Sequence, residues 1–274
     1  MRDVLTFGEA LAGFFPASGE TLTRFVAGAE LNLAVHLARL GRSVTYVTRV
    51  GDDPFGIAVS EALAAQRIDA CVAVDPERRT GIYFRELGGS GPRRVFYYRA
   101  GSAASQLGPD DLPPLDGYRI VHATGVTAAL GPSCLAAVEH AAGAAFFSLD
   151  VNFRPALWSA ERCREVLLPL CARAAVVFVS DDDSAALAPA DALDAGAADV
   201  VHMRGAGGAF YLGQDGTRLE ARAPEVEAVD TVGAGDAFAA GFLHARLAGA
   251  EPLEALQEGC RLGAETVARV GDSV

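Results

Sequence analysis

Short runs rich in β-branched residues alternate with alanine- and leucine-rich stretches along most of the chain. The β-rich runs fit buried strands, and in one intervening stretch Leu33, Leu37 and Leu40 recur at helical spacing before Gly41. This alternation is typical of a parallel sheet with crossover helices, so it predicts one α/β domain. The predicted strands are residues 4–8, 44–50, 119–124, 145–150, 175–180 and 199–203, and the predicted helices include residues 133–143, 160–173, 236–247 and 253–270.

Two β-rich runs, residues 80–86 and 94–99, break the alternation and are joined through the glycine-rich residues 88–91. That is the pattern of a hairpin, and it predicts a small β-sheet that projects from the main domain. A period of two puts Tyr83 with Arg85, and Tyr97 with Arg99, on one face of their strands. These side chains form either a lid over a ligand or an aromatic pair that only stabilises the hairpin.

All 23 basic side chains of the 274-residue chain are arginines, and 35 acidic residues give a net charge of −12. The absence of lysine excludes a G-x-x-x-x-G-K-[ST] phosphate loop and Schiff-base catalysis. The acidity argues against nucleic-acid binding, which depends on clustered cations. No apolar run reaches the roughly 18 residues of a membrane span. We therefore expect neither nucleic acid nor a membrane as a partner.

The five cysteines, Cys71, Cys134, Cys163, Cys171 and Cys260, contain no C-x-x-C pair. A disulfide or zinc framework is therefore not expected, and the thiols are predicted to be buried and free in a cytoplasmic protein. The histidines lie far apart in the sequence, so no metal cluster is expected either.

The most specific motif is D-T-V-G-A-G-D at residues 230–236, which leads into a predicted helix. Gly233, Ala234 and Gly235 let backbone amides turn toward one point, and the helix dipole favours an anion there. Asp236 stands in the first turn, where a carboxylate could deprotonate a hydroxyl that attacks a phosphoryl group. The alternative is an ordinary glycine-rich turn with Asp236 as a helix cap.

This string resembles the second signature, D-T-x-G-A-G-D, of the ribokinase-like (PfkB) carbohydrate kinases. G-A-E-L-N-L-A at residues 28–34 resembles their first signature, and G-D-D-P-F-G at residues 51–56 resembles their G-x-D-x-x-G turn. The resemblance covers essentially the whole chain. It implies a Rossmann-like, three-layer α/β/α ribokinase-like fold, with a β-sheet lid contributed by about residues 9–27 and 80–100. It also implies ATP and Mg²⁺ as cofactors, Asp236 as catalytic base, and Gly233, Ala234 and Gly235 as the anion hole.

The sugar side departs from ribokinases and fructokinases. No lysine follows the first-signature glycine, and G-E-A-L-A-G at residues 8–13 lacks the usual sugar-binding aspartate. Arg99 and Arg154 are present instead, and guanidinium groups pair well with a carboxylate, although each could serve in a structural ion pair. Arg154 follows a predicted strand end, where ligands bind in open α/β sheets. Together, the segments at residues 28–32, 81–86, 95–105 and 150–158 are similar to 2-keto-3-deoxygluconate kinases. That resemblance implies substrate contacts from Gly28, Asn32, Tyr83, Tyr97, Arg99, Arg154 and Asp272.

The nucleotide side is less regular. S-D-D-D at residues 180–183 stands in place of the family's N-x-x-E motif, so Asp183 would act on Mg²⁺ indirectly, unless the segment is a solvated acidic turn. R-G-A-G-G-A at residues 204–209 resembles the K/R-x-G-x-x-G stretch along ATP, and Cys260 replaces an asparagine near adenine. The implied nucleotide contacts are Ser180, Arg204, Gly205, Gly207, Gly208, Gly233, Gly235 and Cys260.

The leading hypothesis is an ATP-dependent kinase that converts 2-keto-3-deoxygluconate to its 6-phosphate. The alternatives are a kinase of fructose, ribose or a nucleoside, a non-catalytic sugar-binding protein on the same fold, and an NAD-dependent oxidoreductase. The last lacks a G-x-G-x-x-G after the first strand. Family members usually continue past the position of Asp272, so the C-terminal end is expected to be short. The exposed edge of a lid sheet favours a homo-oligomer.

Overall fold

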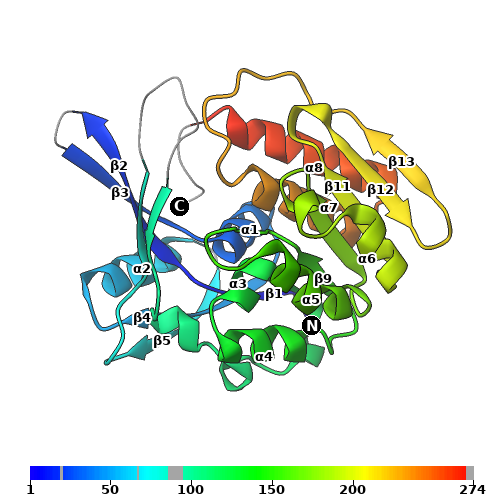
Figure 1. The fold of residues 1–274 in the computed structure, drawn as a ribbon. Helices are drawn as coiled ribbons and strands as arrows, with labels where there is room; N and C mark the ends of the chain where they lie inside the picture. Colours follow the sequence, from blue (N-terminus) through cyan, green and yellow to red (C-terminus); the bar gives the residue numbers. More distant parts are fainter. Residues whose placement is uncertain (19–20, 67, 86–94, 270–274) are drawn as a thin grey trace.

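The structure, a computed structural model, describes residues 1–18, 21–66, 68–85 and 95–269 (Figure 1). The strands are β1 (Arg2–Phe7), β2 (Leu11–Ser18), β3 (Thr21–Ala27), β4 (Val44–Gly51), β5 (Asp69–Asp75), β6 (Ile82–Arg85), β7 (Val95–Tyr98), β8 (Tyr118–Thr124), β9 (Phe147–Asp150), β10 (Val176–Ser180), β11 (Asp199–Met203), β12 (Ala209–Gly213) and β13 (Arg218–Ala221). The helices are α1 (Ala29–Arg39), α2 (Pro54–Ala65), α3 (Gly125–Ala129), α4 (Pro132–Ala141), α5 (Ala160–Cys171), α6 (Pro189–Ala195), α7 (Ala234–Leu247) and α8 (Pro252–Val267).

The main sheet has nine strands in the order β13-β12-β11-β10-β9-β8-β1-β4-β5. The strands from β11 to β5 pair in parallel, and β12 and β13 add an antiparallel edge. Strand order reverses between β1 and β8, because β4 and β5 extend to one side of β1 and β8 to β11 extend to the other. Such a reversal opens a crevice at the carboxyl ends of the strands, and it is the expected place for a ligand.

Helices cover both faces of the main sheet, so the fold has three layers (Figure 1). Neighbouring residues of β1 show why: Val4 packs in the core beneath α1, α7 and α8, whereas Leu5 packs in the core beneath α4 and α5. A strand that is buried on both faces is largely apolar, as the pattern of residues 4–8 indicated, and Thr6 is the buried polar residue of β1. The predicted three-layer fold is therefore present.

Four strands form a second, small sheet in the order β3-β2-β6-β7, which projects beside the main sheet (Figure 1). β6 and β7 form the predicted antiparallel pair, with Tyr83 opposite Tyr97 and their ring centroids 5.7 Å apart. Phe14 of β2 stacks on Phe84 at 5.2 Å, which continues the aromatic contacts across the sheet. β3 and β7 are its edge strands, and the homo-oligomer expected from an open edge stays a prediction.

The predicted strands and helices agree with the structure to within a few residues. α7 begins at Ala234 rather than at Asp236, because Gly233 takes a φ of 77° and serves as the N-cap. The pattern did not identify β12 and β13, the antiparallel edge of the main sheet, nor β5 at its other edge, nor the short helices α3 and α6. One thiol prediction was wrong: Cys71 lies exposed on β5, whereas the other four cysteines are buried and free. In the described part of the chain, no helix is long and apolar enough to cross a membrane.

Candidate active site

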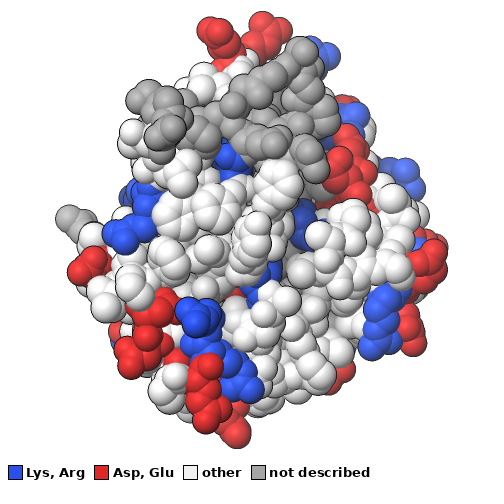
Figure 2. Space-filling model, turned by 60° about the vertical axis from the view of Figure 1, so that its left-hand side comes forward, with Lys and Arg blue, Asp and Glu red and all other residues white. Residues whose placement is uncertain are grey.

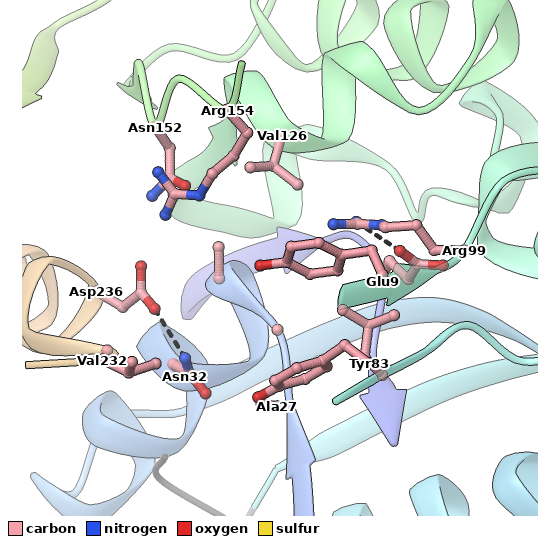
Figure 3. A pocket seen from close by; sticks show the side chains of 15 residues that line it. Glu9, Ala27, Asn32, Tyr83, Arg99, Val126, Asn152, Arg154, Val232 and Asp236 are labelled. Atoms are coloured by element: carbon pink, nitrogen blue, oxygen red, sulfur yellow. Dashed lines mark hydrogen bonds and ion pairs between the residues drawn. The ribbon is translucent and has the colours of Figure 1, made fainter. Parts of the chain in front are cut away.

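A cleft lies where the carboxyl ends of β1, β8 and β9 meet the small sheet and the first turns of α1 and α7 (Figure 3). It therefore lies at the reversal of strand order described above. The lining residues are Glu9, Leu11, Ala27, Gly28, Ala29, Asn32, Tyr83, Tyr97, Arg99, Val126, Asn152, Arg154, Val232, Gly233 and Asp236. Figure 2 shows arginine atoms among uncharged side chains in the middle of one face, with acidic side chains mostly near its edges.

Asp236 and Asn32 join two helix N-termini at the cleft. Asn32, in the first turn of α1, donates a hydrogen bond from Nδ2 to Oδ2 of Asp236 at 2.8 Å. Asp236 is in the first turn of α7 and is half-buried, so its carboxylate is oriented but still accessible. Because both helices point their positive ends toward this spot, it favours a negative charge.

The loop before α7 has the backbone that an anion site requires. Gly233 has a left-handed φ of 77°, which favours glycine, and the amides of a first helical turn lack intrahelical acceptors. The amide of Ala234 makes a long bond of 3.4 Å to the carbonyl of Thr231. A Cβ on Gly235 would find Met203 Cε only at 3.8 Å, so protein packing does not require glycine there. A ligand that approaches the backbone closely would require a glycine at position 235.

Glu9 is a cleft residue that sequence reasoning missed. It follows β1 and is 2% exposed, and its carboxylate pairs with the Arg99 guanidinium at 2.5 Å and with the Ser102 hydroxyl. Burial raises the pKa of Glu9, while Arg99 and Ser102 act in the opposite direction. The charge of Arg99 is therefore already balanced by one carboxylate. Its guanidinium carbon also lies 5.5 Å from the centroid of the Tyr97 ring.

Arg154 enters the cleft from the loop after β9. Figure 3 shows Asp236 and Arg99 on opposite sides of the cleft and Arg154 between them, from a third side. Its side chain is exposed and donates from Nη1 to the carbonyl of Phe153 at 3.0 Å. Among the described residues, it forms no ion pair with a carboxylate. Its neighbour Asn152 adopts a φ of 41°, which marks a tightly constrained turn.

The pfkB carbohydrate kinase family matches residues 1–274, the full length of the chain. The chain belongs to this family. The 2-dehydro-3-deoxygluconokinase of Thermoproteus tenax is 35% identical over 266 residues, covering 91% of this chain and 82% of the relative. The fructokinase of Klebsiella pneumoniae is 31% identical over 258 residues, covering 88% and 83%. The crystal structure of 2-dehydro-3-deoxygluconokinase from Thermotoga maritima superimposes with a TM-score of 0.89 at 25% identity, covering 100% of this chain and 96% of that one.

Membership makes this protein a carbohydrate kinase with the ribokinase-like fold, as the signatures predicted. The alternative of an NAD-dependent oxidoreductase is therefore wrong. The relatives include kinases of an acidic sugar and kinases of a neutral sugar, so family membership does not identify the sugar substrate. The residues of the cleft must decide between them.

On the nucleotide side of the kinase, Asp183 is buried instead of lying in a solvated turn. Its Oδ1 accepts from the Phe153 amide at 2.6 Å, and its Oδ2 accepts from the amide and the hydroxyl of Ser180 at 2.7 and 2.6 Å. The carboxylate thus joins the ends of β9 and β10. Within the described residues, no group of three or more His, Cys, Asp or Glu residues could hold a metal ion. The indirect action of Asp183 on Mg²⁺ stays a prediction.

Arg204 and Cys260 are engaged with the protein itself. Arg204 pairs with Glu220 at 2.7 Å and lies over the Phe210 ring at 3.8 Å from its centroid. Gly205 and Gly208, on either side of Gly207, take φ values of 51° and 86°, and a Cβ on Gly208 would collide with the carbonyl of Ala221. Cys260 is buried in α8, with its thiol directed at that same carbonyl. Their nucleotide contacts stay predictions, and Asp272 lies outside the described residues.

Asp150, at the carboxyl end of β9, is a buried acid that the sequence analysis did not single out. Burial, Asp183 and Asp236 all raise its pKa well above its usual range, while Asn152 and Arg154 oppose the shift. A carboxyl whose pKa is raised by folding binds its proton more tightly in the folded state. Folding stability therefore falls as the pH rises from the unfolded pKa toward the folded one.

Replacing Asp150 by asparagine should remove this pH dependence. We expect the melting temperature of Asp150→Asn, relative to wild type, to increase as the pH rises through the range above the usual pKa of an aspartate. Only the trend is predicted, because the amide also changes the bonds from Asn152. Melting curves across that range test it, and a difference that is constant with pH would contradict it.

Proposed function

We propose that this kinase transfers the γ-phosphoryl group of ATP to the 6-hydroxyl of 2-keto-3-deoxygluconate, also called 2-dehydro-3-deoxygluconate. The observation that carries the proposal is the pair of arginines, Arg99 and Arg154, that lines the cleft. Arg99 is neutralised by Glu9, and Arg154 adds one positive charge without an acidic partner among the described residues. The lining holds two arginines and two carboxylates, Glu9 and Asp236, so Arg154 is the guanidinium that remains for a carboxylate of the substrate, and its planar donors suit that group.

The sugar would lie across the cleft, with its carboxylate toward Arg99 and Arg154 and its 6-hydroxyl beside Asp236. Asp236 accepts the hydroxyl proton while the oxygen attacks the γ-phosphorus and the bond to the ADP oxygen breaks. The amides of Gly233 and Gly235, with the α7 dipole, stabilise the charge that develops on the phosphoryl oxygens. Tyr83 and Tyr97 of the small sheet cover the sugar and exclude water, so the small sheet serves as the lid.

ATP and Mg²⁺ fit the residues at the N-terminus of α7. Gly235 lies in the first turn of α7, and the only heavy atom among the described residues that a Cβ there would meet within 4 Å is Met203 Cε at 3.8 Å, which suits the approach of an anion to this helix N-terminus. Mg²⁺ in kinases is held mostly by phosphate oxygens and water, so a protein cage of carboxylates is not needed. When bound, the ion neutralises charge on the phosphates of ATP. Arg204 would reach a phosphate only after leaving Glu220.

A neutral-sugar kinase is the second candidate. The Arg99–Glu9 pair favours it, because a carboxylate 2% exposed in the cleft can accept a hydroxyl of a neutral sugar. The fructokinase relative, at 31% identity, is consistent with this reading.

A panel of sugars separates the two candidates. We expect ADP release, measured in a coupled assay, to be fastest with 2-keto-3-deoxygluconate, and slower with fructose, ribose and a nucleoside. A kcat/KM for fructose equal to or above that for the sugar acid would reject the acidic substrate. The absence of ADP release with every sugar would leave a non-catalytic sugar-binding protein.

Asn32 is expected to be a positioning residue for the base. Replacing it by leucine removes the 2.8 Å bond from Nδ2 to Oδ2 of Asp236, which helps to orient that carboxylate. Orientation of a catalytic group contributes strongly to rate, so we expect kcat to fall by about 10-fold or more. The sugar KM should change by less than about 3-fold, because the sugar carboxylate binds elsewhere. Steady-state kinetics test this, and a rise in KM at constant kcat would assign Asn32 to substrate binding instead.

A further inference from the structure

A buried ion pair connects the small sheet to the loop that precedes α7. Arg85, the last residue of β6, donates from Nη2 to both carboxylate oxygens of Asp230, at 2.9 and 2.7 Å. Their side chains are only 2% and 3% exposed. The two residues are 145 positions apart, so the pair forms only when the small sheet packs against the main domain.

Asp230 is the buried exception in an exposed loop. Residues 224–229 and Thr231 are exposed, whereas Asp230 is 4% exposed. Its amide and that of Val229 also bond to the carbonyl of Val267 in α8, and its Oδ1 accepts from the Val232 amide. The same loop continues directly into the anion site at residues 233–236. The position of that site therefore depends on where Asp230 is held.

Stability alone does not explain the pair. Within the described residues, Nη1 and Nε of Arg85 are buried and have no hydrogen-bond partner, and unsatisfied buried donors are costly. Replacing a buried ion pair by apolar side chains is often neutral or stabilising. The pair does fix geometry, because it forms only at one position of β6 relative to the loop.

β6 also carries a sugar-cleft residue. Tyr83 lines the cleft two positions before Arg85 and lies on the same face of the strand. β6 is held between β2 and β7, so it is an internal strand of the small sheet. One short, rigid strand therefore carries both Tyr83, which would contact the sugar, and Arg85, which contacts the loop before α7.

We propose that Arg85 is a positioning residue that couples occupancy of the sugar cleft to the placement of the anion site. A sugar resting on Tyr83 fixes β6, and Arg85 then holds Asp230 where residues 233–236 face the reacting hydroxyl. This inference rests on the proposed phosphoryl transfer at Asp236, but it does not depend on which sugar is the substrate.

The test is the effect of sugar on nucleotide affinity. The dissociation constant of a non-hydrolysable ATP analogue is measured by calorimetry with and without the best sugar of the panel. We expect the sugar to tighten nucleotide binding in the wild type by about 5-fold or more. In Arg85→Met this factor should fall to nearly one and kcat should fall by about 10-fold, while the dissociation constant of the sugar alone changes by less than about 3-fold. Asp230→Asn, which retains the shape of the side chain, should behave likewise, and combining the two changes should add little.

Two controls separate positioning from folding. Arg85→Lys keeps the charge and should restore part of the coupling. Arg49→Met breaks a half-buried ion pair with Asp111 in the 3₁₀ turn Pro109–Asp111, where neither residue lines the cleft, and should leave the coupling intact. An uncoupled wild type, or an Arg85→Met variant with normal coupling and kcat, would overturn the inference. A near-normal kcat in Asp236→Asn would instead reject the proposed phosphoryl transfer at Asp236, so the two failures are distinguishable.

Discussion

Replacing Asp236 by asparagine is expected to lower kcat by about 10²- to 10⁴-fold, the usual contribution of a general base. The amide keeps the shape of the side chain in the first turn of α7 but cannot accept the hydroxyl proton. The dissociation constants for sugar and nucleotide should change by less than about 3-fold, because the base acts only in the transition state. Coupled ADP assays and calorimetry measure the two quantities separately.

Asp182→Asn is the matched control for this change. Asp182 is an exposed acid in the turn after β10, at the same edge of the main sheet, and it does not line the cleft. We expect this variant to keep kcat within about 3-fold of wild type. If Asp236→Asn kept a near-normal kcat, the assignment of the base would be wrong.

Replacing Arg154 by leucine is expected to penalise acidic sugars selectively. Hydrogen bonds to a charged group contribute about 1.5–3 kcal/mol, so kcat/KM for 2-keto-3-deoxygluconate should fall by roughly 10- to 100-fold. The kcat/KM for fructose should fall by less than about 3-fold, because fructose offers no carboxylate to the guanidinium. The ratio of the two values in steady-state kinetics gives the result.

Arg162→Leu serves as the control for the loss of an arginine. Arg162 lies on α5, is 53% exposed and pairs with Glu165 on the surface. Neither sugar should be affected by its loss, since exposed ion pairs contribute little. An equal loss on both sugars in Arg154→Leu would show that Arg154 shapes the cleft without recognising a carboxylate.

The order of strands and helices was predictable because buried strands such as residues 4–8 are mostly apolar on both faces. Asp236 was predictable because a glycine-rich segment before a helix has a local physical meaning. Glu9 could also have been predicted as a cleft residue, because it directly follows the first predicted strand, just as Arg154 follows a later strand. Its position differs from the family pattern, which has an aspartate in the loop after the first strand.

The remaining features depend on long-range packing. Nothing local in the sequence indicates that Arg85 meets Asp230, since 145 positions separate them and both belong to motifs with other interpretations. The environment of Asp150 arises from the convergence of β9, the turn at Asp183 and α7, and the shift in its pKa follows from that convergence. Periodicity identifies which face of an element is buried, but it does not identify the partner.

A competition experiment measures substrate preference in a single reaction. The wild-type enzyme receives MgATP with equal concentrations of 2-keto-3-deoxygluconate and fructose, and ³¹P NMR follows which phosphate ester accumulates. The initial ratio of the two esters equals the ratio of the two kcat/KM values. We predict that the 6-phosphate of the sugar acid forms in at least 10-fold excess, as one charge-assisted contact would give. Equal amounts, or an excess of fructose phosphate, would contradict an acidic sugar as the substrate.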